Sequence, residues 1–98
     1  MLKHKDSEKD IEKTLCRKVK DIGGHALKFT SGIETGYPDR IVLLPNGIVI
    51  FVELKSQGEK PRKLQTIRHD ELRALGFAVF VIDSLARVDD FITYCKHL

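Results

Sequence analysis

A hairpin pattern in the middle of the chain most constrains the fold. Residues 39–44 and 48–55 are mostly apolar and rich in β-branched side chains, and the run Pro45-Asn46-Gly47 between them has the composition of a tight turn. With a turn of this length, cross-strand pairing places Asp39 opposite Glu53. The sequence therefore predicts two antiparallel strands with a pair of carboxylates at the end far from the turn.

Capping residues and chain-breaking glycines divide the rest of the chain into further elements. In order, we expect a helix over residues 7–22, a strand over 25–30, a loop over 31–36, the hairpin, a polar loop over 56–60, a second helix from Pro61 that ends before Gly76, a strand over 77–82, and a final helix capped by Ser84 with Leu85, Val88, Phe91 and Ile92 inward. The 98 residues suffice for one domain over residues 1–98 and exclude two-lobed enzymes, eight-stranded barrels and solenoids. We expect an α/β fold with the order αβββαβα.

The first helix carries an acidic residue on its apolar side. At about 100° per residue, its apolar residues form one stripe roughly 80° wide. They are Ile11, Leu15, Val19 and Ile22. Glu8 projects within about 20° of the centre of this stripe, and Glu12 lies about 60° from it. A carboxylate directed at the core side of a helix needs a chemical reason.

The opposed carboxylates predict a cation site. Directly opposed side chains have Cβ atoms roughly 4.5 to 5.5 Å apart, so two like charges destabilise the pair unless a cation or a proton intervenes. Oxygen ligands without histidine or thiolate favour Mg²⁺ or Mn²⁺ over Zn²⁺. Lys55 shares a strand face with Glu53 because side chains alternate along a strand. We therefore expect a divalent ion at Asp39 and Glu53, with Lys55 beside it and Glu8 approaching from the first helix. Such a group of residues can catalyse phosphodiester hydrolysis.

Charge and composition narrow the partners. The formal net charge is +3 and the pI is about 9.0, which permits nucleic acid as a partner without requiring it. The longest apolar run, residues 77–82, is too short to span a membrane, and no apolar signal-peptide core is present, so we expect a cytoplasmic protein without a membrane partner. Cys16 and Cys95 are far apart and no histidine has a Cys or His at zinc-ligand spacing, which indicates two reduced, apolar cysteines.

The motif Pro38-Asp39, followed by Glu53-Leu54-Lys55, resembles that of the PD-(D/E)XK nuclease superfamily. The longer runs from Gly36 to Arg40 and from Phe51 to Lys55, followed by Gly58, Pro61 and Gln65, resemble the stand-alone virus-type replication-repair nuclease (VRR-NUC) domain over residues 7–83. This resemblance implies a restriction-endonuclease-like αβββαβ core, with a mixed central sheet flanked by helices and followed here by a C-terminal helix.

The resemblance also implies roles for individual residues. Asp39 and Glu53 would be metal ligands, Glu8 the acid from the first helix that joins them, Lys55 the catalytic lysine and Gln65 a positioning residue. Both Glu8 and Glu12 suit a first helix of this kind, and the stripe angle favours Glu8. Small stand-alone members of the family are similar in habit to four-way-junction resolvases and act as homodimers. The resemblance thus implies an Mg²⁺- or Mn²⁺-dependent, structure-selective DNA endonuclease that acts on branched DNA as a homodimer.

Several basic side chains are candidate DNA contacts because they can neutralise phosphates. The candidates at the active end are Lys60, Arg62 and Lys63, with Lys28 and Tyr37 flanking the loop and Arg40 next to Asp39. A further row on one flank of the first helix, Lys9, Lys13, Arg17 and Lys20, fits an ordinary solvated face equally well.

Two other functions compete with a structure-selective nuclease. One is a non-catalytic nucleic-acid-binding module on the same fold, which opposed carboxylates argue against because they repel phosphates. The other is a restriction-type or general metal-dependent nuclease, for which a chain of 98 residues leaves little protein to read bases. The sequence leaves open the choice between DNA and RNA, the choice between Mg²⁺ and Mn²⁺, and the number of metal ions.

Overall fold

The expected order of elements is confirmed. The computed structural model describes residues 5–98. His4, one of the histidines without a partner at zinc-ligand spacing, therefore lies outside the described residues. In chain order the elements are α1 (Glu8–Asp21), β1 (His25–Lys28), β2 (Arg40–Leu44), the short 3₁₀ turn η1 (Pro45–Gly47), β3 (Ile48–Leu54), α2 (Lys63–Ala74), β4 (Ala78–Ile82) and α3 (Leu85–Lys96). No helix within residues 5–98 is long and apolar enough to cross a membrane.

The four strands form one mixed sheet in the order β1-β2-β3-β4. The β1–β2 and β2–β3 pairs are antiparallel, and α2 connects β3 to its parallel neighbour β4. In the hairpin, Leu44 pairs with Ile48 and Arg40 with Val52, which is the register predicted from the turn. Two successive residues of the turn have left-handed φ: Gly47 with φ of 74°, and Asn46 with φ of 68°, a conformation that asparagine tolerates better than most residues.

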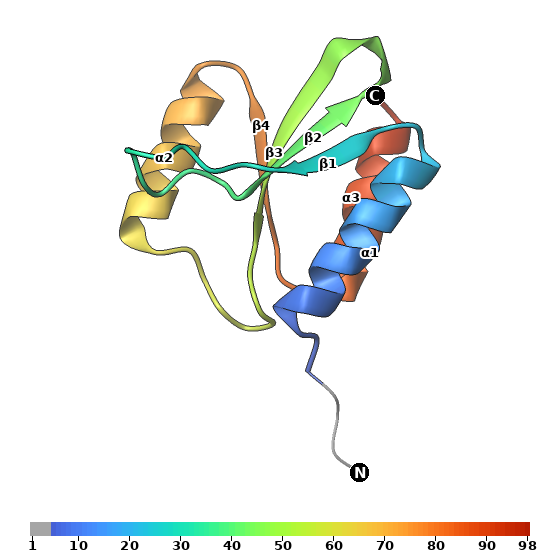
Figure 1. Ribbon diagram of the computed structural model, residues 1–98, viewed down its shortest axis with the longest axis horizontal. Coiled ribbons are helices and arrows are strands. Elements are labelled where there is room, and N and C mark those ends of the chain that lie inside the picture. Colours follow the sequence, from blue (N-terminus) through green and yellow to red (C-terminus); the bar gives the residue numbers. More distant parts are fainter. Residues whose placement is uncertain (1–4) are drawn as a thin grey trace.

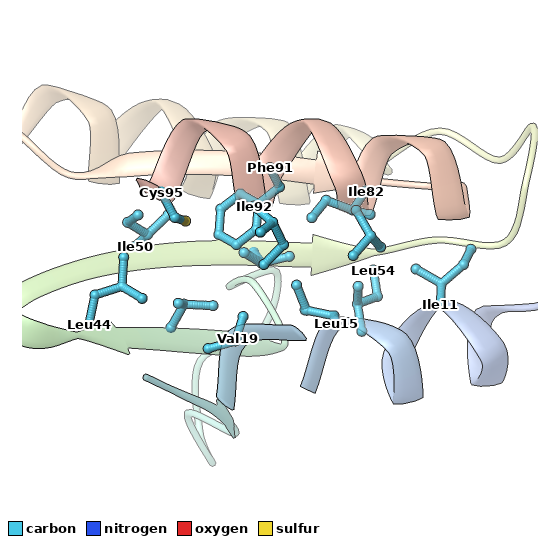
Figure 2. Close-up of a cluster of buried hydrophobic side chains, with 13 residues drawn as sticks. Ile11, Leu15, Val19, Leu44, Ile50, Leu54, Ile82, Phe91, Ile92 and Cys95 are labelled. Atoms are coloured by element: carbon cyan, nitrogen blue, oxygen red, sulfur yellow. The ribbon is translucent and has the colours of Figure 1, made fainter. Parts of the chain in front are cut away.

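Helices cover both faces of the sheet (Figure 1). α1 and α3 lie on one face, and α2 lies on the other. The larger core lies between the sheet and the α1/α3 pair, and Figure 2 shows its side chains converging from the helices and from alternate strand positions. These are Ile11, Leu15, Val19, Val42, Leu44, Ile50, Val52, Leu54, Ile82, Val88, Phe91, Ile92 and Cys95. The buried Cys95 and the half-buried Cys16 are both free thiols, as expected.

The second face of the sheet has a smaller core under α2. Phe51 and Val79 from the sheet pack with Leu72 of α2. Since Ile50, Val52 and Leu54 belong to the larger core, the alternating residues Phe51 and Glu53 of β3 face α2. This alternation decides which helix can contact Glu53.

Three sequence expectations are wrong at the ends of elements. α2 begins at Lys63 rather than at Pro61, because the side chain of Gln65 accepts the N–H of Arg62 at 2.8 Å and so makes Arg62 the residue before the helix. The first strand ends at Lys28 rather than at residue 30, because after Phe29, whose N–H still donates to the carbonyl of Asp39 at 2.8 Å, the chain leaves the sheet. Leu85 is 36% exposed rather than inward, since side chains in a first helical turn point back past the end of the helix.

Candidate active site

Asp39 and Glu53 meet on the α2 face of the sheet, at the end far from the hairpin turn. Asp39 directly precedes β2, and the register of the hairpin continues to place it opposite Glu53 of β3. Its Oδ1 accepts the backbone N–H of Leu54 at 3.1 Å, and its carbonyl accepts the N–H of Phe29 at 2.8 Å. Burial raises the pKa of Asp39, aided by the charge of Glu8. The residue is therefore held on both sides, by β3 through one carboxylate oxygen and by Phe29 through its backbone carbonyl, and its carboxylate faces a second acid.

Glu53 is a buried carboxylate with an unused oxygen. The residue is 4% exposed, and its Oε1 has no hydrogen-bond partner among residues 5–98. Its Oε2 lies 3.5 Å from Nζ of Lys55, the residue two positions along the same strand face. Burial, together with the charge of Asp39, raises the pKa of Glu53 to about 7 against the opposing effect of Lys55. An unpartnered oxygen in such a place is costly unless a proton or a cation occupies it.

Gln65 connects the start of α2 to Glu53. Its Nε2 donates to Oε2 of Glu53 at 3.0 Å, while its Oε1 accepts the N–H of Arg62 at 2.8 Å. Both ends of the amide are therefore used, and each bond fixes the orientation of the other. Because Oε2 of Glu53 already has Gln65 and Lys55 as neighbours, Oε1 is the oxygen left open.

The two glutamates of α1 have different surroundings. Glu12 pairs with the guanidinium of Arg40 at 2.5 Å, on the face of the sheet away from Glu53. Glu8 is exposed, at the first position of α1, and its charge acts on Asp39. Of the two acids, Glu8 is the one near the acidic pair.

The chemistry of these donors fits a hard divalent cation. Asp39 and Glu53 supply carboxylate oxygens without histidine or thiolate, and one oxygen is buried without a partner. No three His, Cys, Asp or Glu side chains in the described part of the chain lie together closely enough to hold a metal ion as they stand. Glu8 would therefore join the pair through a side-chain movement or through water.

The candidate DNA contacts fall in three places. Lys60, Arg62 and Lys63 are exposed on the loop that joins β3 to α2 and at the start of that helix, near Glu53 through Gln65. Lys28 and Arg40 pair across β1 and β2 and so share the α1 face, where Arg40 also donates to the Ala26 carbonyl at 3.3 Å.

Tyr37 belongs to the loop between β1 and β2, which rests on α2. Its ring packs edge-on against Phe29, and the guanidinium of Arg68 lies 5.1 Å from its centre. Arg68 also donates to the carbonyl of Thr35 at 3.1 Å. No sequence pattern indicated this role for Arg68, because it depends on a loop that leaves the sheet and returns just before Asp39.

His69 is a second residue that the sequence reasoning missed. It is 2% exposed, its Nε2 has no partner within residues 5–98, and burial lowers its pKa, with Arg73 and Lys55 contributing. Its position four residues after Gln65 and three before Leu72 puts it on the sheet-facing side of α2, and that spacing could have identified it.

The fold and the opposed acids define the class of protein as the PD-(D/E)XK nuclease superfamily. A relative named "Putative nuclease p44", from Acyrthosiphon pisum secondary endosymbiont phage 1, is 53% identical over 77 residues, which cover 79% of this chain and 83% of that protein. A solved structure described as "VRR_NUC domain" superposes with a TM-score of 0.84 at 32% identity, over 90% of this chain and 96% of that one. The chain belongs to the VRR-NUC family. No family model matches it.

Proposed function

We propose that this protein is a divalent-metal-dependent endonuclease that hydrolyses phosphodiester bonds in DNA and prefers branched DNA. The observation that carries the proposal is the buried carboxylate of Glu53, whose Oε1 has no partner although Asp39 lies opposite. A module that only binds nucleic acid gains nothing from two acids placed together, since they repel phosphates. The nuclease name of the 53%-identical relative supports the same function.

Asp39 and Glu53 would hold the Mg²⁺ or Mn²⁺, and Glu8 would contribute from the start of α1. When bound, the ion would polarise a phosphoryl oxygen and acidify a water molecule. Gln65 keeps the Glu53 carboxylate in one orientation through its bond to Oε2, so that Oε1 stays free for the ion. The Lys55 ammonium, 3.5 Å from Oε2, is placed to stabilise negative charge that develops on the phosphate.

Lys60, Arg62 and Lys63 would hold the DNA backbone beside this site. All three are exposed, and none makes an ion pair within the part of the chain that the structure describes. They lie where α2 begins, so the free N–H groups of its first turn add to the attraction for a phosphate. Lys28 and Arg40 are weaker candidates for DNA contacts, because they lie on the α1 face of the sheet, away from Glu53. Tyr37 is also a weaker candidate, because its ring already packs against Phe29 and Arg68.

We also propose that two copies of the chain associate through the outer face of α2. Leu64, Ile67 and Leu75 are 41%, 44% and 75% exposed on this helix, and Phe77 follows it at 38%. On the loop that rests against α2, Ile33 is 97% exposed. A two-fold dimer would cover these side chains and would present two acidic pairs to two strands of a branched substrate.

A cleavage panel tests the nuclease function. Duplex, flap, splayed-arm and four-way-junction DNA, with matched RNA duplexes, are incubated with Mg²⁺ or Mn²⁺ and read on both strands. We expect metal-dependent cuts in DNA, fastest on the junction, and none with Asp39→Ala, whose fold is checked by circular dichroism. Binding without cleavage under all conditions would favour a binding module, and equal cutting of duplex and junction would leave a general nuclease.

Sedimentation tests the dimer. Wild-type protein should sediment as a dimer at micromolar concentration, whereas Ile67→Asp should give a folded monomer. Leu98→Asp is the matched control, since Leu98 is 57% exposed at the end of the chain beyond α3, on the other side of the sheet. A wild-type monomer would refute the dimer without touching the metal site.

A further inference from the structure

Asp6 lies where three separate segments of the chain meet. Its backbone N–H donates to Oε1 of Gln57 at 2.8 Å, and its carbonyl accepts the N–H of Gln57 at 3.3 Å. Its carboxylate Oδ2 accepts the N–H of Leu85, the first residue of α3, at 2.8 Å. We call these three hydrogen bonds the Asp6 latch. It joins the segment before α1 to the loop after β3 and to the start of α3.

Each residue of the Asp6–Gln57 pair lies two positions along the chain from a residue of the proposed site. Asp6 precedes Glu8, with only the α1 cap Ser7 between them, and Gln57 follows Lys55 at the same spacing. Beyond β3 the backbone is already held on one side, because the N–H of Lys55 donates to the carbonyl of Ile82 at 3.0 Å. The latch therefore sets the place of the start of α1 relative to the strand end that carries Lys55.

Glu8 needs such a restraint. α1 packs on the face of the sheet opposite to Asp39 and Glu53, so its first residue can approach the pair only around the end of the sheet. Figure 1 shows this end of α1 beside the start of the loop that follows β3. Glu8 itself is exposed and makes no hydrogen bond or ion pair with another residue of the range 5–98 through its side chain. Its position thus depends on the backbone that carries it.

Capping of α3 does not by itself account for Asp6. The side chain of Ser84 already accepts the N–H of Arg87 at 3.1 Å, so α3 has an ordinary cap without Asp6. The two hydrogen bonds between Asp6 and Gln57, one to the Gln57 side chain and one from its backbone N–H, do not involve α3 at all. What all three bonds share is that they fix the chain just before Glu8.

We propose that the Asp6 latch holds Glu8 in register with Lys55 and the acidic pair, so that Asp6 and Gln57 are positioning residues of the nuclease site. The proposal rests on the proposed function, because it requires that Glu8 contributes to a metal site. It goes beyond that function by assigning a role to two residues that touch neither the metal nor the DNA.

The test compares metal dependence in single and double variants. Gln57→Ala removes one bond of the latch, and Asp6→Ala removes the bond to α3. Each should raise the half-saturating Mn²⁺ concentration for DNA cleavage, and the Kd for Mn²⁺ by calorimetry without DNA, by about tenfold, the scale seen for groups that orient ligands. Asp6→Asn keeps an oxygen acceptor and should restore metal dependence close to that of the wild type.

Two controls separate positioning from stability. Ser84→Ala removes the other cap of α3 and should lower Tm while leaving the Mn²⁺ dependence unchanged. In a Glu8→Ala background, Gln57→Ala should produce no further change in Mn²⁺ dependence, because the residue it positions is gone. All measurements are made well below the Tm of the least stable variant.

The outcomes are distinct. Wild-type Mn²⁺ dependence in both Gln57→Ala and Asp6→Ala, or a full additional effect in the Glu8→Ala background, would overturn the latch while leaving the nuclease intact. A wild-type protein that neither binds Mn²⁺ nor cuts DNA would overturn the proposed function, and the latch with it.

Discussion

Replacing Glu53 with glutamine tests whether the buried, negatively charged carboxylate destabilises the metal-free protein. Burial and the charge of Asp39 raise the pKa of Glu53 from 4.5 to about 7. The folded protein therefore holds this proton more tightly than the unfolded chain does. The resulting stabilisation is fully present below pH 4.5 and is lost as the pH rises through about 7.

The size of the effect follows from the shift. A rise in pKa from 4.5 to about 7 corresponds to roughly 3 kcal/mol in the free energy of unfolding. Glutamine has nearly the same shape and does not titrate. Metal-free wild-type protein should thus be about as stable as Glu53→Gln near pH 4.5 and roughly 3 kcal/mol less stable than the variant above pH 7.5.

Urea unfolding at several pH values, with a chelator present, measures this difference. Glu59→Gln is the matched control, since it removes a carboxylate from an exposed position in the loop after β3. Added Mn²⁺ at pH 7.5 should stabilise the wild type more than Glu53→Gln, because a bound cation takes the place of the proton. A stability difference that stays constant from pH 4.5 to 7.5 would refute the reasoning.

Three further predictions concern chemistry, DNA affinity and folding. Lys55→Ala should keep metal binding by calorimetry but slow single-turnover cleavage by about two orders of magnitude; normal cutting with weak DNA binding would make Lys55 a phosphate anchor instead. Changing Lys60, Arg62 and Lys63 together to Ala should reduce the salt slope of DNA affinity by about three without moving the cuts, and an unchanged slope in fluorescence anisotropy would exclude these contacts. Gly36→Ala should cost about 2 kcal/mol in urea unfolding, because φ there is +89° and a Cβ would lie 2.8 Å from Cγ of Leu64; Gly32→Ala, with φ of +82° and open space, measures the strain alone.

Local patterns were enough to predict the elements and the acidic pair. The turn at Asn46 determined the hairpin register, and the register placed Asp39 opposite Glu53. The side-chain alternation that set Lys55 beside Glu53 is a property of any strand. The helical stripe correctly gave the buried Ile11, Leu15 and Val19. The roles of these site residues in metal binding and catalysis stay predictions.

What could not be predicted depends on contacts between distant segments. The sequence did not show which apolar residues of α2 would be buried: Leu72 is, whereas Leu64 and Ile67 are exposed, because the sheet covers only one side of the helix. No pattern in the sequence paired Arg40 with Glu12, since that ion pair requires the packing of α1 on the sheet. The bonds between Asp6 and Gln57 span 51 positions and had no local sign at all.

The number of residues in the turn Pro45–Gly47 determines which residue pairs with Asp39. Five strand steps, or roughly 17 Å, separate Leu44 from Asp39, yet the turn decides which residue Asp39 meets. An insertion that moved the pairing by one would bring Asp39 opposite Leu54, whose side chain belongs to the other face of the sheet. A change of length in the turn should therefore disturb the acidic pair more than one in the exposed loop around Ile33, although that loop is only six residues from Asp39 and the turn is roughly 17 Å from it.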